Sequence, residues 1–159
     1  MKTTVVGISD MKVSNNPEEV LITYSLGSCL GVIIYDPVAR VAGMLHSMLP
    51  LSKIDPHKAK ISPFMFVDTG IPMLFKEAYR LGAEKKNIIV KAMGCSSLLD
   101  EKGFFKIGER NFTVLRKLLW KNNILIEKQD IGGSQSRTAS IIIESGAVKI
   151  KSRGKEYLL

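Results

Sequence analysis

One stretch of the sequence brings together the residue types that covalent catalysis needs. The segment Gly27-Ser28-Cys29-Leu30-Gly31 places a cysteine between two flanking glycines. Glycines permit a tight turn that exposes a nucleophile and lets a substrate approach the backbone, whose N–H groups can stabilise an oxyanion. The spacing is similar to a nucleophile elbow with cysteine in place of serine, although an apolar strand follows here and not a helix. A buried cysteine that only packs is the alternative.

The two histidines differ in what they can contribute. His46 lies inside an apolar segment, Val41–Leu49, that is predicted to pair with the strand following Cys29. Such pairing would bring the imidazole beside the thiol, where an imidazolium lowers the thiol pKa and supplies the thiolate. A core histidine bonded to the backbone is the alternative. His57 lies in a polar segment that we expect to be an exposed loop.

The remaining chemical motifs are weaker. Cys95, in Met93-Gly94-Cys95-Ser96, also follows a predicted strand and a glycine and is the rival nucleophile, but no histidine is close to it in sequence and packing is the preferred interpretation. The cysteines and histidines lack the close pairs that are typical of structural zinc, so no metal is expected. Phosphate-binding and dinucleotide-binding glycine motifs are absent from the sequence, and no cofactor is expected.

The elements that would position these residues are mostly strands. β-Branched and apolar runs bounded by turn signals predict strands and two hairpins, at 4–8, 20–24, 31–35 paired with 41–49, 87–93, 124–130, and 139–143 paired with 147–151. Apolar residues at helical spacing predict one helix over about 64–81, which either begins near Ile71 or is kinked by Pro72, and another over 109–121. We expect 51–63 to be an exposed loop. The pattern indicates a mixed α/β or α+β fold, formed by a single domain over residues 1–159.

Composition limits the class of protein. Hydrophobic residues make up 45% of the 159 residues and charged residues 24%, which is typical of a globular domain. No signal peptide or membrane span is visible, so we expect a soluble cytoplasmic protein with reduced thiols. Residues 1–80 hold 8 basic and 7 acidic side chains, whereas residues 81–159 hold 15 and 8. The basic second half indicates an anionic partner.

Several separated motifs, in order, resemble the CheD family of chemoreceptor glutamine deamidases over nearly the whole chain. The resemblance is strongest at Leu26–Cys29 and at the sequence His46-Ser47-Met48-Leu49-Pro50. Further motifs lie at Tyr35-Asp36-Pro37, at Ile107-Gly108-Glu109-Arg110-Asn111, and at Asp130-Ile131-Gly132-Gly133 with Arg137. One departure is Gly94-Cys95-Ser96, where the family usually has Gly-Gly-Ala.

The resemblance implies a catalytic triad that falls on Cys29, His46 and Thr23. It also implies a single-domain α/β sandwich with mixed and antiparallel strands and two to three helices, likened to toxin-type deamidases. The implied reaction is hydrolysis of receptor glutamine side chains through a thioester, with the phosphatase CheC as a partner. In this mechanism Thr23 would orient the imidazole through its hydroxyl or its carbonyl, the Cys29 N–H would hold the oxyanion, and Gly27, Ser28 and Gly31 would shape the turn.

Three other functions are compatible with the residues. A non-enzymatic adaptor would bind a receptor or CheC through the same surface. A cysteine protease would use the same chemistry on another leaving group. A nucleic-acid binder would use the basic half, but aromatic residues do not alternate with the cations at Lys149, Lys151, Arg153 and Lys155, so this function is not favoured. We expect the basic half to be a docking surface for an acidic receptor.

Overall fold

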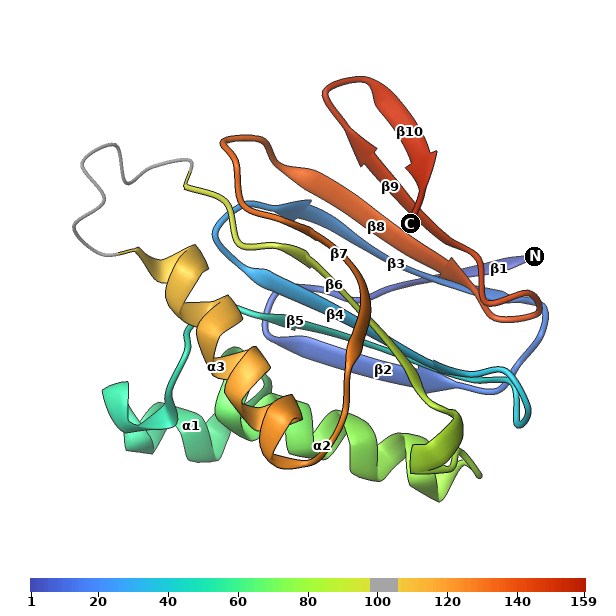
Figure 1. The fold of residues 1–159 in the computed structure, drawn as a ribbon, viewed down its shortest axis with the longest axis horizontal. Coiled ribbons are helices and arrows are strands. Elements are labelled where there is room, and N and C mark those ends of the chain that lie inside the picture. Colours follow the sequence, from blue (N-terminus) through green and yellow to red (C-terminus); the bar gives the residue numbers. More distant parts are fainter. Residues whose placement is uncertain (98–105) are drawn as a thin grey trace.

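The computed structural model describes residues 1–97 and 106–159, which form two five-stranded sheets covered on one side by helices (Figure 1). Sheet A has the order β1-β3-β8-β9-β10 and sheet B the order β2-β5-β4-β6-β7. The strands of sheet A are β1 (Lys2–Val5), β3 (Glu19–Leu26), β8 (Arg137–Ile142), β9 (Val148–Ser152) and β10 (Lys155–Leu158). Those of sheet B are β2 (Asp10–Ser14), β4 (Leu30–Asp36), β5 (Val41–Ser47), β6 (Ile89–Gly94) and β7 (Ile126–Ile131).

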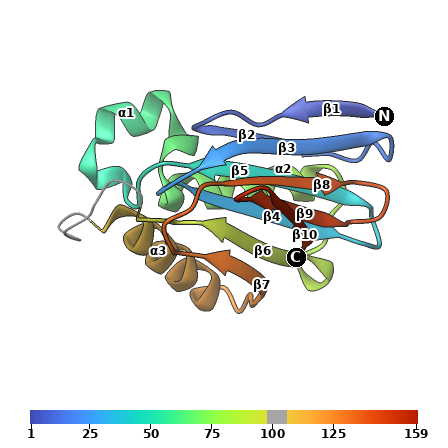
Figure 2. The same ribbon diagram turned by 90° about the horizontal axis from the view of Figure 1, so that it is seen from above.

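The molecule has three layers, because sheet B is apolar on both faces. Alternate residues of β4 belong to different cores: Ile33 and Tyr35 face sheet A, whereas Leu30, Val32 and Ile34 face the helices. Every residue of β4 and β5 is buried, as expected for strands covered on both sides. Figure 1 shows sheet A, sheet B and the helices one below the other, and Figure 2 gives the view from above, in which the two sheets overlap. The prediction of a mixed α/β sandwich with few helices is confirmed.

Within the described residues three α-helices lie on the side of sheet B that faces away from sheet A, and the second and third pack directly on it. They are α1 (Pro56–Ile61), α2 (Val67–Arg80) and α3 (Ile107–Lys121), with short 3-10 turns at Ser52–Ile54, Pro63–Met65 and Lys85–Asn87. Helix α2 buries Ile71, Leu74 and Phe75 against the sheet. Pro72 lies inside α2, so a start near Ile71 is wrong and the longer helix is correct.

Several predicted elements need correction. The segment 51–63, expected to be a loop, contains α1, whose first turn is fixed by Pro56 and by the Asp55 carboxylate accepting from the Lys58 N–H at 3.0 Å. Strands β2 and β10 were not predicted, since both are short and polar. The first strand lies at Lys2–Val5 and not at 4–8, and β5 ends at Ser47.

The chain crosses from sheet A to sheet B twice at one end of the molecule. The first crossing joins β1 to β2 through residues 6–9, and the second joins β3 to β4 through residues 27–29. The Thr23 hydroxyl donates to the Val6 carbonyl at 2.7 Å, and the Ser9 N–H donates to the His46 carbonyl at 2.9 Å. The first crossing therefore supports β3, which leads into the second crossing, and β5, which pairs with the strand that follows it.

Helix α3 connects the parallel strands β6 and β7 and begins directly against the end of β6. Gly108, in its first turn, makes this approach possible. A Cβ atom at this position would lie 2.5 Å from both the carbonyl carbon and the carbonyl oxygen of Cys95, and 2.7 Å from the Ser96 oxygen. Because these are backbone atoms, they cannot move aside independently of the strand.

We predict that Gly108→Ala destabilises the fold, although alanine is normally about 1 kcal/mol better than glycine inside a helix. The backbone clash should lower the free energy of unfolding by about 2–4 kcal/mol, measured by urea denaturation. Gly7→Ala is the control, because no heavy atom lies within 4 Å of a Cβ built there. A Gly108→Ala protein as stable as the control would contradict the close approach of α3.

Candidate active site

His46 and Thr23 meet between the two sheets. Thr23 is on β3 of sheet A, His46 is on β5 of sheet B, and the Thr23 hydroxyl oxygen lies 2.7 Å from the His46 Nδ1. The single hydroxyl hydrogen of Thr23 is donated to the Val6 carbonyl, so the oxygen must accept from the imidazole. Neutral His46 therefore carries its proton on Nδ1, and its Nε2 is a free base. The contact is made by the hydroxyl, which was one of the two possibilities considered for Thr23.

Both side chains of this pair are buried. Thr23 and His46 are each 1% exposed, and within residues 1–97 and 106–159 the His46 Nε2 has no hydrogen-bond partner. Burial lowers the pKa of the His46 imidazole to about 4, because a charged ring would lose its hydration there. The imidazole is therefore neutral at physiological pH. A buried, unpartnered ring nitrogen is costly in a purely structural residue.

Cys29 lies at the crossing next to this histidine. In the β4–β5 ladder Gly31 is directly opposite His46, so Cys29, two residues earlier, is a diagonal neighbour on the same face, and side chains in such positions can meet. Cys29 is half-buried and packs against the core between the sheets. Burial raises the pKa of its thiol, and the Cys29 N–H partly opposes this by bonding to the sulfur. Both shifts favour the uncharged forms of the two groups, whereas the sequence suggested an imidazolium that stabilises a thiolate.

The turn before Cys29 does not depend on its glycines in the way that the sequence predicted. Ser25 adopts the left-handed conformation with φ 56°, whereas neither Gly27 nor Gly31 has a positive φ. Gly31 lies inside β4, so it does not shape the turn. A Cβ there would lie 2.8 Å from the Leu26 Cδ1 and 3.0 Å from the Met93 sulfur, so Gly31 makes room for the packing beneath Cys29.

The crossing is fixed by its carbonyl groups. The Gly27 carbonyl accepts from the Ser96 N–H at 2.9 Å, and the Cys29 carbonyl accepts from the Cys95 N–H at 2.8 Å. Both donors follow β6, so the crossing is tied to the centre of sheet B. The Cys29 N–H, the predicted oxyanion donor, points toward the sulfur of the same residue, where it can act on the thiol.

Cys95 is buried, with 3% of its surface exposed, and it belongs to the core under the helices. Cys29, by contrast, packs against the core between the sheets. Burial, and then the proximity of Cys29, raise the pKa of the Cys95 thiol to about 12. This placement agrees with the interpretation of Cys95 as a packing residue. His57 is exposed on α1, and within the described residues no three His, Cys, Asp or Glu side chains form a group that could hold a metal.

Comparison with known proteins places the chain in a family. The model of the CheD family, described as CheD chemotactic sensory transduction, matches residues 48–152. The chain belongs to the CheD family. It is 52% identical to a Syntrophus aciditrophicus protein named probable chemoreceptor glutamine deamidase CheD 1, over 97% of this chain and 96% of the relative. Proteins from Solibacter usitatus, at 46% identity over 98% and 92%, and Anaeromyxobacter dehalogenans, at 41% over 96% and 96%, have similar names.

One CheD motif, Ile107–Asn111, contains a residue whose role the sequence did not indicate. Asn111 on α3 is fully buried, and its side-chain amide donates to the Ser28 carbonyl at 3.1 Å and to the Met48 carbonyl at 3.0 Å. The β4–β5 ladder ends at Leu30 and Ser47, immediately before these two carbonyls. The Asn111 amide therefore bridges the segments that carry Cys29 and His46 where the backbone ladder stops. A buried asparagine on an otherwise apolar helix face was the available signal.

The other late motif supplies a buried cation. Arg137 is 2% exposed, and its guanidinium donates to the Gly132 carbonyl at 2.9 Å, the Ser96 hydroxyl at 2.9 Å and the Gly94 carbonyl at 3.2 Å. It also forms an ion pair with Asp130 at 3.3 Å. Arg137 begins β8 of sheet A, so these bonds join sheet A to the ends of β6 and β7. They fix the segment whose N–H groups hold the crossing.

We predict that His46 makes the fold sensitive to acid. A histidine titrates near pH 6.5 in the unfolded chain but near 4 in the folded protein, so between these values the unfolded state binds more protons and stability rises with pH. Acidification through this range should remove about 3 kcal/mol of stability. Urea denaturation at several pH values measures this. In His46→Gln the slope should flatten, and an unchanged slope would contradict the buried neutral imidazole.

We also predict that Asn111 controls the reactivity of Cys29. Asn111→Leu removes both bridging bonds, and a displacement of about 1 Å can lower the rate of a positioned reaction by about 100-fold. Alkylation of Cys29 by iodoacetamide, measured as a pH profile under conditions where the protein is folded, should slow to the rate of His46→Gln.

Leu115→Ala is the matched control for this experiment, because Leu115 lies one turn further along the same buried face of α3. It should lower stability by about 2–5 kcal/mol without changing the alkylation profile of the folded protein. Equal effects on alkylation would show that Asn111 only packs.

Proposed function

We propose that this protein hydrolyses glutamine side chains of chemoreceptors to glutamate and releases ammonia. The observation that supports this most directly is the hydrogen bond between Thr23 and His46, which leaves a free ring nitrogen on a residue diagonal to the half-buried Cys29. A nucleophile, a base and a group that orients the base are the parts that thioester chemistry requires. The curated relatives are named as probable chemoreceptor glutamine deamidases, and this supports the choice of substrate.

In the first half of the proposed reaction, the Cys29 sulfur attacks the carboxamide carbon of the glutamine while its proton passes to the His46 Nε2. A neutral pair is suited to this step, because the charges form only as the new bond forms. The Cys29 N–H is the proposed donor to the oxyanion. The protonated His46 then gives its proton to the departing nitrogen, which leaves as ammonia, and a thioester remains.

In the second half, His46 takes a proton from water, and the resulting hydroxide attacks the thioester carbon. The sulfur leaves and recovers the proton from His46, so that glutamate and the free thiol are formed. Thr23 keeps the proton on Nδ1 throughout and so keeps Nε2 facing the reaction. Because its hydroxyl is neutral, Thr23 stabilises the imidazolium less than a carboxylate would.

The proposal includes the setting of the reaction. The substrate is the cytoplasmic part of a receptor, so the protein acts in the cytoplasm, and the phosphatase CheC is the second partner implied by the CheD resemblance. No helix within the described residues is long and apolar enough to cross a bilayer. A non-enzymatic adaptor remains the competing function. It predicts that receptor binding survives Cys29→Ala and that wild-type protein releases no ammonia.

We predict graded losses of activity for substitutions within the triad. Cys29→Ala should abolish ammonia release, and His46→Gln should lower kcat by about 10²–10⁴-fold because the general base is lost. Thr23→Val should cost about 5-fold, the equivalent of one neutral hydrogen bond of about 1 kcal/mol. Mass spectrometry of a receptor cytoplasmic domain, together with an ammonia assay, measures these changes.

Cys95→Ala serves as the thiol control and should keep its activity. Loss of activity in Cys95→Ala with full activity in Cys29→Ala would show that the nucleophile is assigned to the wrong cysteine. Equal losses in Thr23→Val and His46→Gln would show that Thr23 does more than orient the ring.

A further inference from the structure

The outer face of α3 carries an apolar hollow that the chemistry at Cys29 does not use. Between the second half of α3 and the start of β7 lies a hollow of about 1050 Å³, lined mainly by apolar and basic side chains. Two large apolar side chains in it face solvent: Trp120 is 80% exposed and Leu125 is 87% exposed. Exposed large apolar residues gathered in a hollow indicate a binding surface.

The charges around this hollow all have one sign. Its charged lining residues are Arg116, Lys117 and Lys121, and no carboxylate lines it within the described residues. Tryptophan and arginine are also the residue types that contribute most to protein interfaces. A partner that fits must therefore combine an apolar ridge with acidic flanks.

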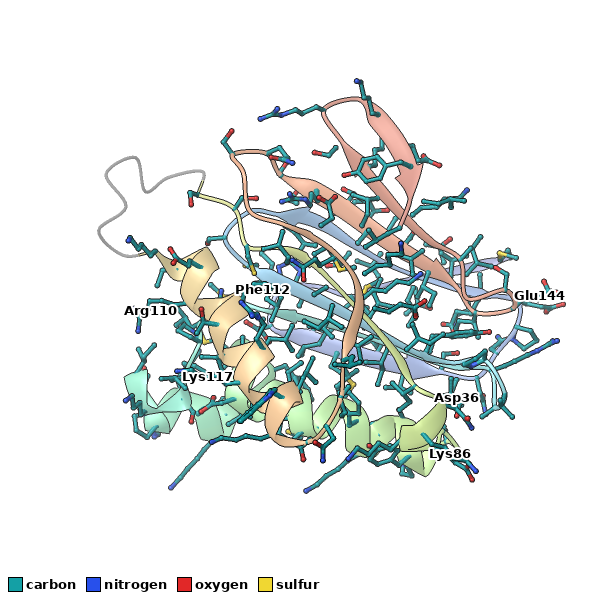
Figure 3. The ribbon with its side chains drawn as sticks, in the orientation of Figure 1. Asp36, Lys86, Arg110, Phe112, Lys117 and Glu144 are labelled. Atoms are coloured by element: carbon teal, nitrogen blue, oxygen red, sulfur yellow. The ribbon has the colours of Figure 1, made fainter. Side chains whose placement is uncertain are left out.

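On the exposed face of α3, residues three and four positions apart form a continuous stripe, as expected for a surface that binds another helix. Arg110, Thr113, Lys117 and Trp120 are exposed and recur at helical spacing, opposite the buried face formed by Gly108, Asn111, Leu115 and Leu119. Figure 3 shows Arg110 and Lys117 on the same outer side of α3. Thr113 also lines a smaller hollow that reaches Pro50, just beyond the His46 strand, so the two hollows meet at Thr113 and make one track along α3. The smaller hollow adds the basic residues Lys106 and Arg110 and one carboxylate, Glu109.

We propose that this track, which we call the α3 track, is the docking site for an acidic amphipathic helix of the receptor substrate. This inference rests on the proposed function and adds the surface that selects the substrate. A helix laid into a groove matches the shape, and acidic flanks match the cations. A second copy of this chain is disfavoured because two such basic hollows would face each other across a two-fold axis.

The α3 track has a fixed relation to the chemistry. Asn111 bonds to the segments that carry Cys29 and His46, and Trp120 lies nine residues further along the same helix. At about 1.5 Å per residue, the two ends are about 14 Å apart along the helix axis. A receptor helix bound in the α3 track would therefore be held within a few turns of the thiol.

The test compares an intact receptor cytoplasmic domain with a short glutamine peptide as substrates. Trp120→Ser, and the pair Lys117→Glu with Lys121→Glu, should lower the ratio of kcat/KM for the domain to kcat/KM for the peptide by about tenfold or more, through KM for the domain. The matched charge control reverses Lys149 and Lys151 on β9, where Lys149 is paired with Glu156. An equal fall in the ratio in this control would overturn the proposal, because net charge alone would then explain binding.

The single tryptophan of the chain gives a direct signal. Adding a tryptophan-free receptor domain should shift Trp120 emission to the blue and protect it from acrylamide, since the ring becomes buried. Three outcomes would overturn the proposal: a normal ratio in both α3 variants, a blue shift on self-association measured by sedimentation, or a blue shift with anionic lipid vesicles but not with the receptor domain. If wild-type protein deamidates neither substrate, the proposed function fails instead.

Discussion

The site depends on one constraint: the chain must pass from sheet A to sheet B within the three residues 27–29. This passage places Cys29 between the end of β3 and the start of β4, half-buried, with its carbonyl and that of Gly27 held by N–H groups beyond β6. The sheets cannot slide past each other there, because Thr23 on one bonds to His46 on the other and Arg137 ties both to the same segment. The backbone that passes between the sheets and the hydrogen bond between Thr23 and His46 thus fix the positions of Cys29 and His46 relative to each other.

Burial sets the chemical character of this pair. A charged imidazole would be stabilised in the interior only by an anion, and the groups bonded to the His46 side chain and to its neighbour Thr23 are a neutral hydroxyl and a carbonyl. The same burial that lowers the pKa of His46 raises that of Cys29, so both effects favour the uncharged forms. The uncharged thiol is the less reactive form of a cysteine. The proposed reaction therefore needs His46 to accept the thiol proton as the sulfur attacks.

The sequence was sufficient for those parts of the site that local pattern determines. The turn signal at Asp36-Pro37 and the apolar runs around it predict the β4–β5 hairpin, and this hairpin puts His46 near Cys29. Thr23 followed only from the family resemblance, because contact between two sheets leaves no local pattern. The shift of both groups toward their uncharged forms was not foreseen for the same reason: desolvation is a property of the packed interior. Helix α1 was missed because polar clusters and two prolines in 51–63 indicated a loop, although Pro56 after Asp55 is a helix start.

Helix α3 connects the proposed catalytic residues to the proposed docking surface, because one face supports Cys29 and the other is exposed to a partner. Its buried face is held by Gly108 against the backbone of Cys95 and by Asn111 on two carbonyl groups, so the helix cannot rotate without disturbing Cys29. Its exposed face is on the same rigid element and is therefore oriented relative to the thiol with similar precision. A side chain presented by a bound partner would then approach Cys29 from a defined distance and direction. The chemistry itself does not distinguish one carboxamide from another. Docking that places a particular glutamine at the Cys29 thiol would therefore explain how the enzyme acts on a few glutamines among many.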